Sequence, residues 1–211
     1  MLLYYHKVSI CGNIVTMNPK LNDHAQLAKV LAKKGVMTSQ ELVALLGNKM
    51  QIKRKSDDGV LFPLGSGFYS SPSLDPFTAS IIVVGRYYPQ SVISGLTALV
   101  LNGLSDESLE RIDVDIPRNL SIRNRLLSVH RVSEKNLVGV ENRKFHNQKI
   151  KIYSVERSLC EAYRIDSGAI FYKALKRYVK KYSPRPEQLA MYDQVLRTQV
   201  LRHLQQELAD A

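Results

Sequence analysis

Cysteine is scarce in this chain, tryptophan is absent, and no apolar run is long. The two cysteines, Cys11 and Cys160, lie far apart and fit neither a metal-binding nor a redox spacing. No apolar stretch approaches the roughly 20 residues of a membrane-spanning helix. We therefore expect a reduced protein in the cytoplasm, with no membrane partner.

The first residues do not resemble a signal peptide. Residues 1–10 are apolar only in patches, which His6 and Lys7 interrupt, and no small-residue cleavage site follows. Periodic sequence begins only after Met17, so Met1 and Met17 are both candidate start sites. We predict that residues 1–21 form a disordered extension.

Histidine-based catalytic and metal motifs are also missing. The five histidines are scattered along the chain at spacings that suit no metal site. No motif supports Ser-His-Asp or Cys-His catalysis. We expect no cofactor and no bound metal.

Positive charge is in clear excess. The formal net charge is +11, while 45% of the residues are hydrophobic, as in ordinary globular proteins. Such a charge favours a polyanionic partner: nucleic acid first, then an acidic protein or an anionic membrane surface. Up to Leu74, nine basic and four acidic residues give the segment a charge of +5.

Two helices are predicted at the start of this basic segment. In residues 22–34, apolar residues recur at helical spacing, lysines face away, and Gly35 follows as a stop. Thr38-Ser39-Gln40-Glu41 has the capping-box pattern, in which two side chains satisfy free backbone N–H groups at a helix start. The second helix ends at Gly47-Asn48.

The next segment, Lys49 to Lys55, has little to bury and carries four cations. This composition suits the second helix of a helix-turn-helix, which presents cations to DNA phosphates. A solvated charged loop is the alternative interpretation.

A hairpin follows this segment. Residues 60–64 and 68–70 are predicted strands, and Gly65-Ser66-Gly67 supplies residues that tolerate positive φ in the turn. Pro63 cannot donate to a strand ladder, so its strand should lie at an edge. Helices followed by a hairpin have the order of a winged helix-turn-helix, to which we assign residues 22–72. Its predicted DNA contacts are Thr38, Ser39, Gln40, Lys49, Lys53, Arg54, Lys55 and Ser66.

Residues 71–76 are rich in turn-forming residues and mark a domain boundary. Residues 75–211 are predicted to form an α/β domain with a small sheet and a C-terminal helical extension, so the whole chain is α+β. Helices are expected at 77–84, 92–101 and 155–163, and strands at 111–117, 127–132 and 148–153. Residues 187–208 are expected to form one long helix.

A basic helix face is predicted near the C-terminus. Residues 170–182 have an apolar stripe on one side and five cations on the other, without an intervening acid. We interpret this face as an anion-binding surface, with an ordinary solvated helix surface as the alternative. Its residues are Lys173, Lys176, Arg177, Lys180 and Lys181.

One constellation indicates an enzyme. Ser94-Gly95 precedes Asp113-Val114-Asp115, and strand periodicity places both carboxylates on one face, as in the Mg²⁺ site of nucleotidyltransferases. The competing interpretation places both aspartates on the solvent side of an edge-exposed strand. We favour it because the glycine pair is incomplete and the strand at 127–132 offers no third carboxylate.

Seven short motifs follow one another between roughly Leu27 and Ser167. They are KGVMT at 34–38, LGSGFY at 64–69, YPQSVIS at 88–94, TAL at 97–99, NGL at 102–104, VDIP at 114–117 and VERSL at 155–159. In their order and spacing, the chain resembles the AbiEi antitoxins of bacterial type IV toxin–antitoxin systems.

The resemblance implies a winged helix that binds duplex DNA upstream of its own operon and represses it. It also implies a C-terminal domain that counteracts a nucleotidyltransferase-like toxin without necessarily forming a stable complex. The chain departs from the family in its thin, lysine-rich third helix and at Ser94-Gly95-Leu96, where the family more often has a His or a bulkier residue. The alternatives are a nucleotidyltransferase using Asp113 and Asp115, and an interaction module that uses the basic helix face without DNA.

Overall fold

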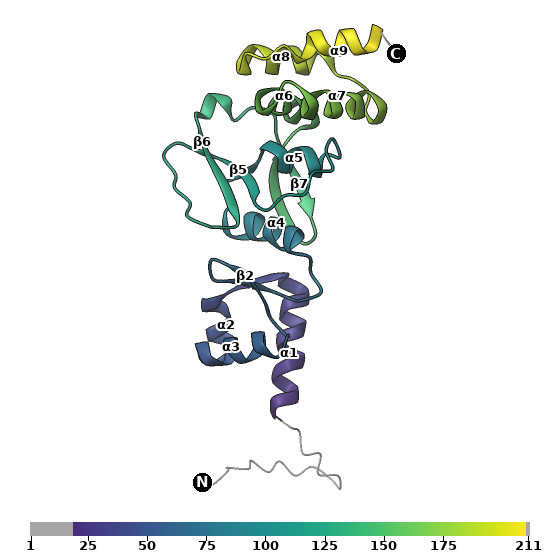
Figure 1. Ribbon diagram of the computed structural model, residues 1–211. Helices are drawn as coiled ribbons and strands as arrows, with labels where there is room; N and C mark the ends of the chain where they lie inside the picture. The colour runs from purple at the N-terminus through teal and green to yellow at the C-terminus, as the bar shows by residue number, and fades with distance from the viewer. Residues whose placement is uncertain (1–18, 210–211) are drawn as a thin grey trace, which may run out of the picture.

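The structure, a computed structural model, describes residues 19–209 (Figure 1). Because α1 begins at Pro19, the extension predicted to reach residue 21 is wrong for residues 19–21. The rest of that extension, with both candidate start sites, lies outside the described residues. The N-terminal part contains α1 (Pro19–Lys34), β1 (Val36–Thr38), α2 (Ser39–Leu46), α3 (Lys49–Asp57), β2 (Phe62–Gly65) and β3 (Phe68–Ser70).

Local capping defines the two helices of the helix-turn-helix. The Thr38 hydroxyl accepts the Glu41 N–H at 3.1 Å, and the Glu41 carboxylate accepts the Thr38 N–H at 2.8 Å, so the predicted capping box is confirmed. Gly47 ends α2 at a φ of +90°, which favours glycine. Asn48 caps α3 by accepting the Gln51 N–H. Residues 49–57 therefore form a helix, not a charged loop.

A small sheet completes the N-terminal unit. Within residues 19–209 its strands are antiparallel and lie in the order β1-β3-β2. Strand β2 is at the edge, as Pro63 predicted, while β1 is too short to give a period-2 pattern and was not predicted. Three helices with a hairpin wing make a winged helix-turn-helix. Its core consists of Leu27, Leu31, Met37, Leu42, Ile52 and Leu61.

Helix α4 (Pro76–Tyr87) lies between this unit and the rest of the molecule (Figure 1). It begins at Pro76, where Asp75 accepts the Thr78 N–H at 2.8 Å. It is apolar on two sides, and each side belongs to a different cluster. Ala79, Ile82 and Val83 pack with Val36 and Phe68 of the small sheet, while Ile81 and Val84 pack into the core of a second sheet.

The second sheet has, within the described residues, the strand order β6-β5-β4-β8-β7. Strand β4 runs parallel to β8 and antiparallel to β5, and β5 runs parallel to β6. The helix predicted over 92–101 is wrong at its start, because Val92 and Ile93 pair with both β5 and β8. The strands are β4 (Val92–Ile93), β5 (Ile112–Pro117), β6 (Leu127–Val132), β7 (Val140–Phe145) and β8 (Gln148–Tyr153).

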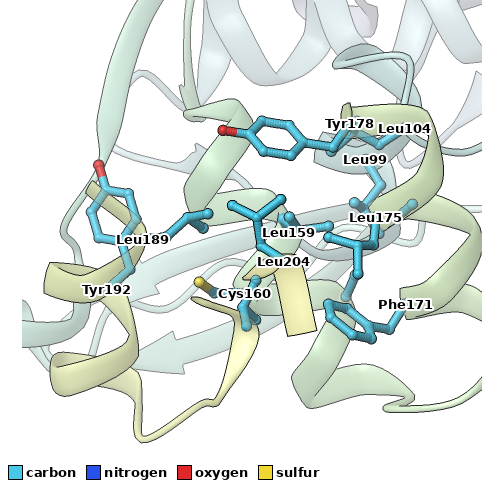
Figure 2. Packing of buried hydrophobic residues seen from close by; sticks show 13 residues of the cluster. Leu99, Leu104, Leu159, Cys160, Phe171, Leu175, Tyr178, Leu189, Tyr192 and Leu204 are labelled. Carbon is cyan, nitrogen blue, oxygen red and sulfur yellow. The ribbon is translucent and has the colours of Figure 1, made fainter. Parts of the chain in front are cut away.

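Helices cover the far side of this sheet (Figure 1). The single helix predicted over 187–208 is wrong, since the chain breaks at Arg197, which has a left-handed φ of 56°. The helices are α5 (Gly95–Leu101), α6 (Val155–Ile165), α7 (Ala169–Lys181), α8 (Pro186–Leu196) and α9 (Val200–Ala209), with a 3-10 turn at Glu134–Asn136. Their shared core, shown in Figure 2, includes Leu99, Leu159, Phe171, Leu175, Tyr178, Leu189 and Leu204.

No helix in the described part of the chain is long and apolar enough to cross a membrane.

A polar cluster fastens α4 to the helix-turn-helix. The Glu41 carboxylate accepts hydrogen bonds from the Tyr87 hydroxyl at 2.5 Å and from Arg86 at 2.8 Å, both on α4. It also accepts from Lys34 of α1 at 3.0 Å. Burial alone would raise the pKa of Glu41, but the hydrogen bonds from Tyr87, Thr38 and Lys34 with the charge of Arg86 outweigh it and lower the pKa to about 2.

The cluster predicts a pH dependence of stability. Because the folded state lowers the pKa of Glu41 from 4.5 to about 2, its contribution should be complete above pH 4.5 and be lost as the pH falls toward 2. Glu41→Gln should lower the free energy of unfolding at pH 7 by about 3 kcal/mol and flatten the profile below pH 5. Urea denaturation across this pH range measures both, and equal profiles for the two proteins would contradict the assignment.

Candidate nucleic-acid interface

The exposed side of α3 carries three of the cations that were predicted to contact DNA. Lys49, Lys53 and Arg54 are exposed. Lys49 and Lys53 lie one turn apart and line one cleft with Ser39 of α2 and with Pro63 and Tyr69 of the wing. The structure therefore brings together residues from the two helices of the helix-turn-helix and from the hairpin.

The start of α2 borders the same cleft. Ser39 donates both its backbone N–H and its hydroxyl to the Gly67 carbonyl, at 2.8 and 3.1 Å, and so joins α2 to the tip of the wing. Gln40 is exposed beside it. Thr38 is half-buried and its hydroxyl is engaged in the capping box, so its role in the structure is to begin the helix.

Lys55 differs from the other cations of α3. Its side chain is only 8% exposed, because it lies on the face of α3 that turns toward the body of the unit, beside buried Ile52. Its carbonyl accepts the N–H groups of Val60 and Leu61, which closes the turn after the helix. Lys55, which the sequence predicted to contact DNA, therefore does not share the exposed face of Lys49, Lys53 and Arg54.

The tip of the wing contacts the second domain. Ser66 has a φ of 51°, and its hydroxyl accepts the backbone N–H of Arg125 at 3.0 Å. Arg125 belongs to the segment between β5 and β6. No role was predicted for this segment, although the sequence contains a signal: residues 118–133 include four arginines and no acid.

The basic face of α7 is partly neutralised by a distant segment. Asp106 lies 2.6 Å from Lys173 and 2.8 Å from Arg177. Hydrogen bonds from Arg177 and then Lys173 hold the pKa of Asp106 well below its usual range. Lys176, Lys180 and Lys181 are exposed and in no ion pair within residues 19–209, and Lys181 donates a hydrogen bond to the Asn102 carbonyl.

Asp113 and Asp115 are not the solvent-side residues of an edge strand, because β5 lies between β4 and β6. Asp113 is held at the start of α5, where its backbone N–H donates to the Thr97 hydroxyl at 2.8 Å and its carboxylate accepts the Thr97 N–H at 3.4 Å. Gly95 permits this approach, since a Cβ there would lie 3.0 Å from the Asp113 carboxylate.

Asp115 is buried, with 5% of its surface exposed. Burial raises the pKa of its carboxyl, although the hydrogen bond from the Tyr153 hydroxyl, at 2.7 Å, opposes the shift. Across residues 19–209, no group of three or more His, Cys, Asp and Glu side chains is arranged to hold a metal ion.

Comparisons with known proteins identify the fold alone. No family model matches the chain, and no match is found among curated proteins. Among solved structures, the Rv2827c protein from Mycobacterium tuberculosis is similar, with a TM-score of 0.55 and 16% sequence identity over 82% of this chain and 71% of that one. This likeness supports the α+β architecture.

The position of Asp113 predicts a structural role. Asp113→Ala should lower the free energy of unfolding by about 1 kcal/mol, because it removes a carboxylate that interacts with the first turn of α5. Chemical denaturation measures the change. Two results together would instead favour a catalytic role. The unsubstituted protein would incorporate nucleotides in the presence of Mg²⁺, and Asp113→Ala would abolish this activity without changing the stability.

Proposed function

We propose that this chain is a DNA-binding regulator that represses its own operon and acts as the antitoxin of an AbiE-like type IV toxin–antitoxin system in the cytoplasm. The observation that carries the DNA-binding half is the position of Lys49, Lys53 and Arg54. They are exposed on the second helix of a helix-turn-helix, beside a hairpin wing. Phosphate contacts of this kind supply much of the affinity of protein for duplex DNA.

The geometry suits insertion of α3 into the major groove. Lys49, Lys53 and Arg54 are exposed along α3, and the start of α2 lies next to it, where the exposed Gln40 side chain can meet the phosphates. Lys and Arg on the exposed side would position the helix, while Gln51, partly exposed on α3, can pair with a base edge. Binding therefore combines a strong electrostatic part with a modest sequence-reading part.

The antitoxin half of the proposal rests on the resemblance to AbiEi proteins in the sequence. The partner is a nucleotidyltransferase-like toxin encoded nearby, opposed by the domain that follows the winged helix. A regulator is favoured over a nucleotidyltransferase because Asp113 interacts with the start of α5 and Asp115 is buried against Tyr153. A module that uses the α7 face alone is disfavoured because Asp106 pairs with two of its cations.

DNA binding is tested by reversing charge on α3. Lys53→Glu with Arg54→Glu should weaken binding to the upstream region of the chain's own operon on the order of a hundredfold, because two phosphate-facing cations become anions. Fluorescence anisotropy over a range of salt concentrations should also show a smaller salt dependence. Lys176→Glu with Lys180→Glu is the matched control, with the same change of charge on exposed residues of α7. Equal losses for both pairs would refute the site, and no binding by the unsubstituted protein would refute the function.

The antitoxin role is tested separately in cells. Expression of the neighbouring nucleotidyltransferase-like gene should arrest growth, and expression of this chain from an unrelated promoter should restore it. The Lys53→Glu, Arg54→Glu variant should lose repression of a reporter placed behind the native promoter yet still restore growth if the second domain carries the antitoxin activity. Continued arrest in the presence of the intact, soluble chain would contradict the role.

A further inference from the structure

The wing of this protein carries no charge. The hairpin from Phe62 to Ser70 contains neither lysine nor arginine, and its tip is Gly65-Ser66-Gly67. A wing commonly lies along the DNA backbone, where it needs cations or hydrogen-bond donors to hold phosphates. Because this wing has no cation, a neighbouring segment would have to supply the positive charge that holds the phosphates.

Three arginines of the second domain lie beside the tip of the wing. Arg111, at the start of β5, and Arg123 and Arg125, before β6, line one open cleft together with Ser66. The backbone N–H of Arg125 donates to the Ser66 hydroxyl at 3.0 Å, so this segment and the wing are in direct contact. Figure 1 shows the long connection between β5 and β6 descending toward the hairpin.

The charge of this segment is uncompensated. Arg118, Arg123, Arg125 and Arg131 fall within residues 118–133, which contain no acid, and all four are exposed. In the part of the chain that the structure describes, none of them has an ion-pair partner, unlike Lys173 and Arg177 of α7. Guanidinium groups bind phosphate oxygens through paired hydrogen bonds, which makes arginine well suited to a nucleic-acid backbone.

These arginines have a fixed position relative to α3. Helix α4 is buried against both sheets, and Glu41 ties it to the helix-turn-helix through Arg86 and Tyr87. Ser39 lines the same cleft as Lys49 and Lys53 of α3 and donates to the Gly67 carbonyl of the wing, while the adjacent Ser66 accepts the N–H of Arg125. A duplex held by α3 and the wing therefore meets a preformed basic surface on the second domain.

We propose that Arg111, Arg123 and Arg125, with the tip of the wing, form a second contact with the phosphate backbone of the duplex that α3 binds. This inference rests on the proposed DNA-binding function and extends it to the second domain. The contact is to phosphates, so it adds affinity for any duplex without adding sequence preference. The wing supplies the shape of the surface, and the second domain supplies the charge.

The test replaces the two arginines nearest the wing. Arg123→Gln with Arg125→Gln should weaken binding on the order of tenfold at about 0.1 M salt, since two charged hydrogen bonds to phosphate are lost. The slope of log K against log salt concentration should fall by about 1.8, or about 0.9 for each contact. The loss should be equal for the operator duplex and for a random duplex of the same length. The contact with Ser66 uses the backbone of Arg125, so both substitutions preserve it.

Lys176→Gln with Lys180→Gln is the matched control, and it should leave the slope unchanged. An unchanged slope in the Arg123, Arg125 variant, or an equal fall in the control, would overturn the inference. If the Lys53→Glu, Arg54→Glu variant loses binding while the arginine variant does not, the proposed function stands and this inference fails. If the unsubstituted protein binds no duplex, both fail together. Thermal melting of each variant checks that a lost contact is not a lost fold.

Discussion

Helix α4 is the element on which the arrangement of the molecule depends, because its two apolar sides are buried against two different sheets. Neither sheet would be covered on that side without it, and exposing such a helix would cost about 25 cal/mol for each Å² of apolar surface. Gly85 brings the helix close to β8: a Cβ there would lie 2.9 Å from the Ile150 side chain and 3.1 Å from the Lys149 carbonyl. The joint between the domains is thus a packed interface, and the turn-rich residues before it do not act as a loose linker.

The Glu41 cluster fixes the orientation of α4 relative to the helix-turn-helix. Apolar packing is tolerant of small rotations, whereas hydrogen bonds from Arg86, Tyr87 and Lys34 to one carboxylate are not. The same carboxylate completes the capping box of α2, so the helix that begins the helix-turn-helix is fixed to α4 by one side chain. Orientation of α3 relative to the second domain follows from these contacts, and with it the alignment of the wing beside the arginines of residues 118–133.

Local signals allowed much of the winged helix to be predicted from sequence. The capping box at Thr38, the glycines of the wing and the edge position of Pro63 each depend on residues within a few positions of one another. Several of the failures share a cause, which is contact between distant segments. Strand β4 is too short to show periodicity and exists because β5 and β8 flank it. Lys55 is buried, and Asp106 pairs with Lys173, for reasons that only tertiary packing supplies.

The same limit applied to the candidate site. Lys49, Lys53 and Arg54 were identified from charge and order along the chain, but their neighbours across the cleft were not. The arginines beside the wing are adjacent to it only because α4 places the second domain there. A separation of 59 residues along the chain hides the contact of Ser66 with Arg125.

Hydroxyl-radical footprinting of the chain on the upstream region of its own operon tests the central claim most directly. A single rigid surface formed by α3, the wing and the arginine segment should protect two adjoining stretches of backbone on one side of the duplex, one flanking the major groove and one beyond it. Uniform cleavage along the duplex, at protein concentrations that would saturate binding by α3, would contradict the account. Protection of the first stretch alone would confine DNA binding to the winged helix.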